Sequence, residues 1–475
     1  MCEFIWYIDI IDKKYYYKIK YFLMKINEKN DLTNGKILQR LLYLAIPIIG
    51  SQTLQMLYNL TDMFWLGRLG SEEVAATGAV GLYLWMSVAF MLLGSVGASI
   101  GVSQAFGSGD INKAKSYTYA SFLICVVFGI LFTSVMLLFR HQLVGFFNFR
   151  EANVAKFAED YLVVVSFTIT LTYLSATMGA VFTASGNSRT PFLCNVIGTS
   201  LNIVLDPIFI FPLKLGVVGA AYATIIGQTA AFLMFIVLFK TSKKRPFEKI
   251  KLFTMPKRND IVWIIKKALP VGVESFLFTF LVMATTRREA FFGADAVALS
   301  RVGSQIESLT WLVGGAFGTA LVSFIGQNYG AKKWDRISAT FRTASLVMFC
   351  YGAFVAFVLA VLGKYLFGLF LPDPVLIERS VLYLRIIAIC QIPMCLEAVS
   401  SNSFRGLGNT LPPAIINTIC NILRVPFVYI LSMEIFGIGL TGVWIGISAS
   451  ACLKSIWSYT WYLFTERKRI NAQMI

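Results

Sequence analysis

Charged residues are scarce in this chain, and histidine occurs only once. Asp, Glu, Lys and Arg together make up 14% of the 475 residues, whereas hydrophobic residues make up 57%. Soluble domains carry about 25% charged residues, so the shortage indicates that lipid rather than water covers most of the surface. The sequence has no phosphate-binding GxxxxGK[ST] loop, and His141 alone cannot anchor a catalytic triad or a metal cluster. We therefore expect neither an enzyme nor an ATP-driven pump.

Acidic residues are outnumbered by basic ones, 25 to 42, which gives a formal net charge of +17. The lysines and arginines gather in short segments between apolar runs, which is how membrane proteins encode their orientation. Nucleic acid is therefore not an expected partner. Seven of the eight cysteines lie within or at the edges of apolar runs, and none has metal-ligand spacing, so we interpret them as small packing residues.

Apolar runs of about 20 residues or more recur along the chain. About 20 residues of helix cross ~30 Å of hydrocarbon, and only helices or closed barrels satisfy their backbone polar groups there. The short alternating segments of a barrel are missing. The sequence therefore predicts an all-α polytopic membrane protein with twelve transmembrane helices, at residues 41–67, 74–105, 116–139, 157–184, 190–213, 215–240, 261–288, 296–327, 338–363, 376–404, 411–432 and 439–463.

The connection after the sixth run, residues 241–260, is rich in lysine and arginine, which predicts that it lies in the cytoplasm. An even number of spans then places both ends there, so we expect a cytoplasmic N-terminal segment, 1–40, and a cytoplasmic tail, 464–475. The expected location is the cytoplasmic (inner) membrane. Met24 begins a polar stretch that leads into the first span, and we expect it to be the physiological start, with 1–23 not native.

Two halves of the chain repeat the same order of residues. Each half has a proline followed 57 residues later by a glutamine: Pro47 with Gln104, and Pro270 with Gln327. Because six spans per half is an even number, the halves share one orientation, related by an axis along the membrane normal. We therefore expect two pseudo-symmetric six-helix lobes, an N-lobe (41–240) and a C-lobe (261–463). Such lobes leave a central cleft, which favours transport and permits a working monomer.

Two acids inside the predicted spans are candidates for the transport chemistry, because an ionisable side chain in a membrane is costly and functional by default. Asp62 and Asp206 lie at similar depths, and Tyr58 and Asn202 precede them by one helical turn. Thr224 lies at a comparable depth in the sixth span. Carboxyl, amide and hydroxyl oxygens at one level suit Na⁺ or a shared proton. The structural alternative is that both acids cap helices or pair with nearby bases.

The second half has no acid at the positions that match Asp62 and Asp206, as expected if a coupling site need exist only once. Its own mid-span acids include Glu274, Glu307 and Glu397. These acids can form interhelical ion pairs that hold the lobe together, or they can act on substrate or on protons. The sequence leaves both interpretations open.

Three runs of the sequence resemble one known family. The segments IPIIGSQTLQMLYNLTDMFWLGRLG, LNIVLDPIFIF and LGVVGAAYATIIGQ look like the multidrug and toxic compound extrusion (MATE) family, DinF-like branch. The resemblance implies two six-helix lobes around a V-shaped cavity and export of organic cations in exchange for Na⁺ or H⁺, without a cofactor. It maps the family's cation site onto Asp62, Asn202, Asp206 and Thr224.

The resemblance also assigns Pro47 to bending of the first helix, and Gln55 and Tyr58 fit the N-lobe cavity beside it. The NorM-like branch of the family places a glutamate about two turns beyond the proline of the seventh helix. Glu274 follows Pro270 by only four residues, so we expect no C-lobe cation site of that kind. The alternative function is a lipid-linked oligosaccharide flippase of the same superfamily, which would line its cavity with several basic residues.

Overall fold

The computed structural model describes residues 31–149, 151–242, 244–248, 254–368, 374–433, 435 and 437–474. Eleven of the described helices are long and apolar enough to cross a membrane. A twelfth span is made by two shorter helices that meet at a bend of 42°. The predicted all-α membrane architecture is therefore confirmed. The start expected at Met24 lies outside the described residues.

The first lobe contains the broken span and a short helix that precedes it. Its helices are α2 (Ile37–Leu69), α3 (Ser71–Gly107), α4 (Ile111–Leu138), α5 (Arg140–Gly145), α6 (Ala152–Ser166), α7 (Thr168–Ala184), α8 (Arg189–Ile210) and α9 (Gly216–Thr241).

The second lobe has six long helices, and the last of them continues through most of the segment predicted as a tail. They are α10 (Arg258–Ala290), α11 (Ala294–Gly330), α12 (Trp334–Gly368), α13 (Pro374–Gly406), α14 (Leu411–Leu431) and α15 (Gly439–Met474).

The predicted fourth span, 157–184, is interrupted between α6 and α7. The side-chain hydroxyls of Ser166 and Thr168 donate hydrogen bonds to the carbonyls of Leu162 and Val165. Thr133 of α4 donates to the carbonyl of Ser166 over 3.0 Å. Hydroxyls that bond backbone carbonyls compete with the helical hydrogen bonds and bend helices. A hydropathy pattern does not register this competition, so an unbroken helix was the wrong expectation.

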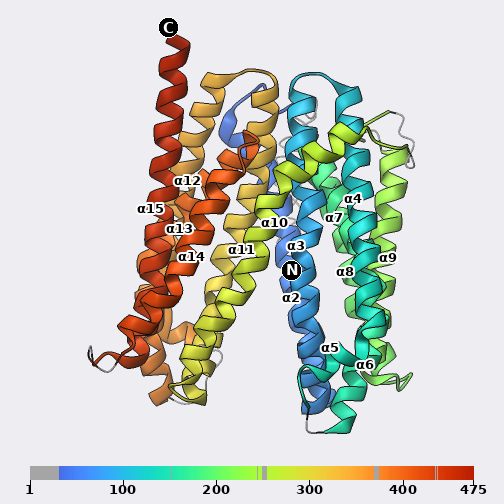
Figure 1. The fold of residues 1–475 in the computed structure, drawn as a ribbon, viewed down its shortest axis with the longest axis vertical. Coiled ribbons are helices and arrows are strands. Elements are labelled where there is room, and N and C mark those ends of the chain that lie inside the picture. The colour runs from blue at the N-terminus through green and yellow to red at the C-terminus, as the bar shows by residue number, and fades with distance from the viewer. Residues whose placement is uncertain are drawn as a thin grey trace, which may run out of the picture.

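The two lobes are close together at one end of the molecule and diverge toward the other (Figure 1). The first end carries the α3–α4 turn, the α11–α12 turn and the α9–α10 connection, and we call it the linker end. The opposite end is called the far end. Helices α2 and α3 of the N-lobe pack against α10 and α11 of the C-lobe.

Two glycines let the lobes approach closely at the linker end. A Cβ atom on Gly107 would lie 1.9 Å from the carbonyl oxygen of Gln327, and one on Gly330 would lie 1.9 Å from the carbonyl oxygen of Gln104. These positions match each other in the repeat, so the contact is reciprocal. Any side chain at either position would force the backbones of α3 and α11 apart.

The same two glutamines tie each lobe to the other. The Gln104 side chain donates to the carbonyl of Gly406 at the end of α13 over 3.0 Å. The Gln327 side chain donates to the carbonyl of Ala184 at the end of α7 over 2.7 Å. Each bond satisfies a carbonyl that a helix end leaves without an intrahelical partner. The linker end is therefore closed by a pseudo-symmetric pair of bonds.

The residues before α2 form a strap, residues 31–36, that lies on the C-lobe. Leu32 is 1% exposed, and its N–H donates to the side-chain oxygen of Gln327 over 3.0 Å. Lys333 donates to the carbonyl of Thr33 over 2.9 Å. The chain segment that leads into the N-lobe is therefore bonded to the α11–α12 turn of the other lobe.

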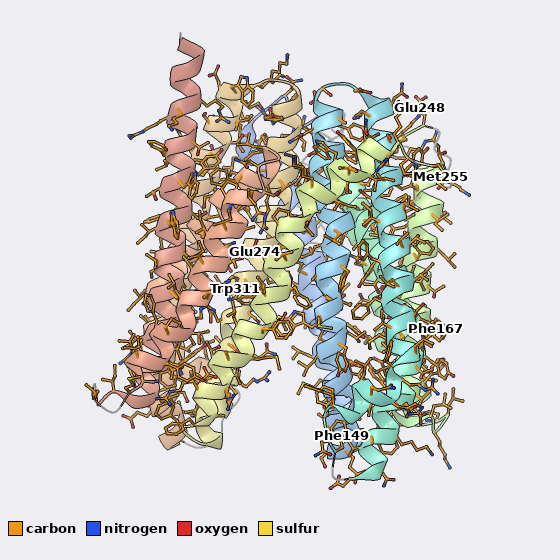
Figure 2. All side chains as sticks on the ribbon, in the orientation of Figure 1. Phe149, Phe167, Glu248, Met255, Glu274 and Trp311 are labelled. Carbon is orange, nitrogen blue, oxygen red and sulfur yellow. The ribbon has the colours of Figure 1, made fainter. Side chains whose placement is uncertain are left out.

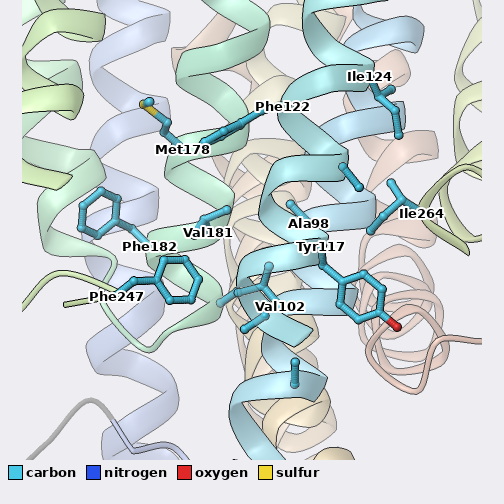
Figure 3. Packing of buried hydrophobic residues seen from close by; sticks show 14 of the residues in the cluster. Ala98, Val102, Tyr117, Phe122, Ile124, Met178, Val181, Phe182, Phe247 and Ile264 are labelled. Carbon is cyan, nitrogen blue, oxygen red and sulfur yellow. The ribbon is translucent and has the colours of Figure 1, made fainter. Parts of the chain in front are cut away.

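The first turns of α2 and α10 are exchanged between the lobes. Leu41 and Ala45 of α2 are buried in a core formed mainly by C-lobe side chains. Ile264 and Ala268, their counterparts 223 residues later, are buried in the N-lobe core. Figure 3 shows Ile264 beside Ala98 of α3, and Figure 1 shows α10 crossing from the N-lobe at the linker end to the C-lobe at the far end. Both helices therefore belong to two bundles.

Large apolar side chains cover the outside of the helices. Leu138 is 73% exposed, Ile389 69% and Phe354 64%. Figure 2 shows Phe167 on the outer side of the N-lobe and Phe149 near the far end. Surfaces of this kind are stable in lipid, where no water has to be ordered around them.

Candidate functional site

A cluster of polar side chains lies inside the N-lobe, where α2, α8 and α9 meet. Asp206 is fully buried and Asn202 is 4% exposed, one turn earlier on α8. The Asn202 amide nitrogen lies 3.4 Å from Asp206 Oδ1 and 3.4 Å from Thr224 Oγ1 of α9. The structure thus brings together three of the four residues assigned to cation binding. We call them, with Asp62 and Tyr58, the N-lobe oxygen cluster.

Close packing of α8 and α9 makes these distances possible. A Cβ atom on Gly198 would lie 2.7 Å from the carbonyl oxygen of Gly227, and one on Gly227 would lie 2.7 Å from that of Gly198. Small residues at helix crossings let backbones approach in membranes. Asn202 follows Gly198 by one turn, and Thr224 precedes Gly227, so the glycine pair sets the distance between the two polar side chains.

Helix α2 supplies the remaining members of the cluster. The hydroxyls of Tyr58 and Thr224 are 3.3 Å apart, and the Thr224 hydroxyl also lies 3.0 Å from the carbonyl of Ala220. Asp62 lies one turn beyond Tyr58 and interacts electrostatically with Asp206 and Tyr58. The two carboxyl groups are therefore near neighbours.

Three oxygens of the cluster have no hydrogen-bond partner. They are buried, and they belong to Asp62 (Oδ1), Asn202 (Oδ1) and Asp206 (Oδ2). An unpaired buried polar atom costs about 1–3 kcal/mol, so three together favour a missing partner that carries positive charge. Neither acid forms an ion pair within the described residues. Both acids lie inside their helices, and neither caps a helix end.

Tyr161 of α6 completes the surroundings of the acids and was not identified from the sequence. Its side chain is buried and interacts electrostatically with Asp62, Tyr58 and Asp206. A polar hydroxyl inside an apolar run was the available signal. The packing of α6 against α9, which brings Tyr161 to the cluster, could not be read from that run.

A cavity of about 480 Å³ lies beside the cluster and is called the N-lobe cavity. Gln55, Tyr58, Asn202 and Thr224 line it, whereas neither Asp62 nor Asp206 does. Serine, threonine, asparagine and glutamine supply its other polar groups, and no charged side chain lines it. The acids thus lie behind a layer of neutral polar side chains.

Pro47 lies inside α2, and the helix continues through it. Proline has no N–H, so the carbonyl four residues earlier loses its helical partner. That carbonyl belongs to Tyr43, and the hydroxyl of Ser188, which precedes α8, lies 3.4 Å from it. Gln55 is exposed on the same helix, and its side chain donates to Asn59 over 3.3 Å.

The three C-lobe acids singled out in the sequence all have partners. Glu274 pairs with Arg405 at 3.2 Å, and Glu397 pairs with Lys454 at 3.7 Å. Glu307 accepts a hydrogen bond from the indole of Trp311 over 3.2 Å. The acids of this lobe therefore differ from Asp62 and Asp206 in being paired.

The MatE family model matches the chain twice, over residues 47–208 and 270–430. The chain belongs to the MATE family. The two matches begin at Pro47 and Pro270, in agreement with the repeat found in the sequence. The family prediction is confirmed, whereas assignment to the DinF-like branch stays a prediction.

Relatives along almost the whole chain include bacterial proteins with transport names. The chain is 28% identical to the probable multidrug resistance protein NorM of Thermotoga maritima, over 90% of this chain and 92% of the relative. It is 28% identical to the probable multidrug resistance protein YpnP of Bacillus subtilis, over 93% and 98%. The multidrug export protein MepA of Staphylococcus aureus is 25% identical, over 88% and 92%.

Solved structures share the fold of this MATE protein. A MOP superfamily transporter from Pyrococcus furiosus matches with a TM-score of 0.86 at 24% identity, covering 94% of this chain and 99% of that one. An outward-facing multidrug resistance MATE transporter also matches with a TM-score of 0.86 at 24% identity, covering 94% and 98%. The two-lobed architecture is thus the family's architecture.

Proposed function

We propose that the protein is a secondary active multidrug exporter, which moves small organic cations out of the cell in exchange for Na⁺ or H⁺. One observation carries this proposal: two buried, unpaired acids lie directly behind a neutral polar cavity. The acids can hold a coupling ion, and the cavity can hold a drug of modest size. The names of the relatives, which include multidrug export proteins, support the same cargo class.

The oxygen cluster offers a route by which ion and drug compete. A cation or proton at Asp62 and Asp206 would draw the Asn202 carbonyl oxygen toward it, because that oxygen now lacks a partner. Asn202 also contacts Thr224, and Thr224 contacts Tyr58. All three line the cavity, so occupation of the acids changes the wall that touches the drug. Coupling requires such differential binding between two states.

Pro47 gives α2 a point at which to bend. The helix lacks one backbone hydrogen bond there, and the contact between Ser188 and the Tyr43 carbonyl is long at 3.4 Å. Bending at this point would carry Tyr58 and Asp62 toward or away from α8. Each elementary charge moving down ~100 mV supplies ~2.3 kcal/mol for such a change.

The basic connection between the lobes supports placing the linker end in the cytoplasm. We infer that both ends of the chain lie there, in a protein of the cytoplasmic membrane that works as a monomer. The lobes diverge at the far end, so this arrangement faces outward (Figure 1). Incoming ions would then reach the N-lobe from outside.

The test is ethidium efflux from proteoliposomes under separately imposed Na⁺ and H⁺ gradients. We expect one gradient to drive efflux in the wild type and the Asp206→Asn variant to lose it. Asp335→Asn, the same substitution at an exposed position of α12, is the matched control. Efflux that persists unchanged in Asp206→Asn would contradict the assignment of the coupling site.

A flippase for lipid-linked oligosaccharides remains the alternative function. It would need basic side chains free to bind pyrophosphate. The N-lobe cavity has none, and Arg405 and Lys454 in the C-lobe are already paired with acids. Movement of a fluorescent pyrophosphate lipid between leaflets, with no ethidium efflux, would favour this alternative.

A further inference from the structure

The C-lobe contains a cavity of its own, about 470 Å³ in volume, and we call it the C-lobe cavity. Four charged side chains line it, whereas the N-lobe cavity has none. They are Glu274, Glu397, Arg405 and Lys454. Two acids and two bases leave the lining with no net charge.

The first ion pair leaves polar atoms unused. Glu274 accepts from Arg405 over 3.2 Å and from the amide of Asn417 over 2.7 Å. The Nε atom of Arg405 and the Oδ1 atom of Asn417 are both buried without a hydrogen-bond partner. Asn417 is only 4% exposed. An arginine held solely for structure would use more of its five donors.

The second pair has the same property. Lys454 lies 3.7 Å from Glu397, which also accepts from the Ser401 hydroxyl over 2.5 Å. At that distance the ammonium group of Lys454 makes only a loose contact, so its three donors remain largely available. Lys454 is 6% exposed, so water does not surround it as at a surface.

A second buried acceptor lies next to Asn417. Asn421, one turn further along α14, is 5% exposed, and its Oδ1 atom has no partner. Both asparagines line the C-lobe cavity, as do both basic residues. The cavity therefore offers unused donors and unused acceptors together, on side chains that are nine-tenths or more buried in the case of Asn417, Asn421 and Lys454.

An aromatic face lies beside these groups. The indole of Trp311 lines the cavity, and the Lys454 ammonium lies 5.7 Å from its ring centre. Figure 2 shows Trp311 and Glu274 at mid-height of the C-lobe. Phe278, one turn beyond Glu274, also lines the cavity. Planar aromatic molecules can pack on such side chains.

We propose that the C-lobe cavity is a second substrate site, and that it takes zwitterionic aromatic molecules. The carboxylate of the molecule would bind Lys454 and the Nε–H of Arg405. Its ammonium group would donate to Asn417 and Asn421. A simple cation would meet two bases and a simple anion two acids, so the balanced lining selects molecules that carry both charges. This proposal rests on the transport function proposed above.

Three probes with one fluorophore test the selectivity: Nε-dansyl-lysine, a zwitterion; dansylcadaverine, a cation; and dansylglycine, an anion. Binding to the purified protein is measured by fluorescence titration. The decisive variant is Glu397→Gln with Lys454→Met, which removes one ion pair without leaving an unpaired charge. We expect its affinity for dansyl-lysine to fall about tenfold or more, with dansylcadaverine binding changed less than about twofold. Thermal unfolding and size-exclusion profiles establish that the variant is folded.

Unchanged dansyl-lysine affinity in the double variant would overturn the proposal, as would an equal loss for dansylcadaverine. A second variant, Asn421→Leu, keeps all four charges and should also weaken the zwitterion. Ethidium efflux distinguishes the two proposals. If ethidium is exported but dansyl-lysine does not bind, only the C-lobe site is wrong. If dansyl-lysine binds through Lys454 but no gradient drives efflux, the site stands and the exporter function is wrong.

Discussion

The two lobes place different chemistry at matching positions of one scaffold. Four residues after its proline, the N-lobe has Ser51 and the C-lobe has Glu274, and each lines the cavity of its lobe. The N-lobe counterpart of Arg405, 222 residues earlier, is Thr183, which also lines its cavity. Thus the Glu274–Arg405 pair stands where the N-lobe has two hydroxyls.

The acids of the two lobes therefore face opposite needs. Asp62 and Asp206 have no base beside them, so a cation is the partner they lack. Glu274 already has Arg405, and gains little from another cation. Duplication has preserved the cavities, while the charges have moved from behind the wall in one lobe to its surface in the other. Ion coupling belongs to the first arrangement and charge-balanced recognition to the second.

The largest expected effect comes from removing the acids of one lobe at a time. The Asp62→Asn, Asp206→Asn double variant should reduce gradient-driven ethidium efflux to the rate of protein-free vesicles. Glu274→Gln with Arg405→Gln should keep the rate within about threefold of the wild type, a change of about 0.7 kcal/mol in the barrier. Initial rates in proteoliposomes decide this. Equal losses in both variants would remove the distinction between the lobes.

Stability should respond with opposite signs. Arg405→Gln leaves Glu274 without its base and should cost about 2–3 kcal/mol, less than a fully buried pair because these side chains are 19% and 15% exposed. Restoring neutrality with Glu274→Gln should recover most of the loss. Asp206→Asn removes an unpaired charge and should leave the melting temperature equal or higher. A lower melting temperature for Asp206→Asn would show that its carboxylate has a partner.

The glycine crossing of α8 and α9 is the next largest target. A Cβ atom on Gly227 would lie 2.9 Å from Asn202 Cβ, so Gly227→Ala should push Asn202 from Thr224 and cost about 1–3 kcal/mol. The ion that drives efflux should then raise the melting temperature less than in the wild type. Gly78→Ala on α3, where a Cβ meets nothing within 4 Å, is the control.

The C-lobe does not repeat this crossing. The positions 222 residues after Gly198 and 223 after Gly227 hold Cys420 and Ser450. Ser450 accepts a hydrogen bond from Arg424 over 2.9 Å. If Gly227→Ala leaves ion-dependent stabilisation intact, close packing of these helices is not what separates the two lobes.

The smallest expected effect concerns the bend in α2. Ser188→Ala removes the contact to the Tyr43 carbonyl and should cost about 0.5–1 kcal/mol, because the bond is long. Pro47→Ala restores an N–H for that carbonyl, so Ser188→Ala should have no effect in that background. Thermal unfolding of the four proteins of this cycle measures the coupling, and additive effects would argue against it.

Much of this arrangement could be predicted from the sequence because helices convert spacing into position. Counting turns brought Asn202 and Asp206 onto one face of α8 and placed Tyr58 and Asp62 alike on α2. The partner of Glu274 could not be found this way. Arg405 lies 131 residues away, near the end of another helix, and their contact depends on how α10 and α13 pack. Periodicity within one helix carries no information about that packing.

The exchanged first turns of α2 and α10 have a consequence for movement between the lobes. Leu41 travels with the C-lobe and Ile264 with the N-lobe, while the remainder of each helix travels with its own bundle. Any relative rotation must therefore be absorbed within these two helices. Pro47 and Pro270 lie just after the exchanged turns, where one backbone bond is missing. The two prolines are in this sense a pair of hinge pins, and the strap at residues 31–36 adds a third attachment to one of them alone.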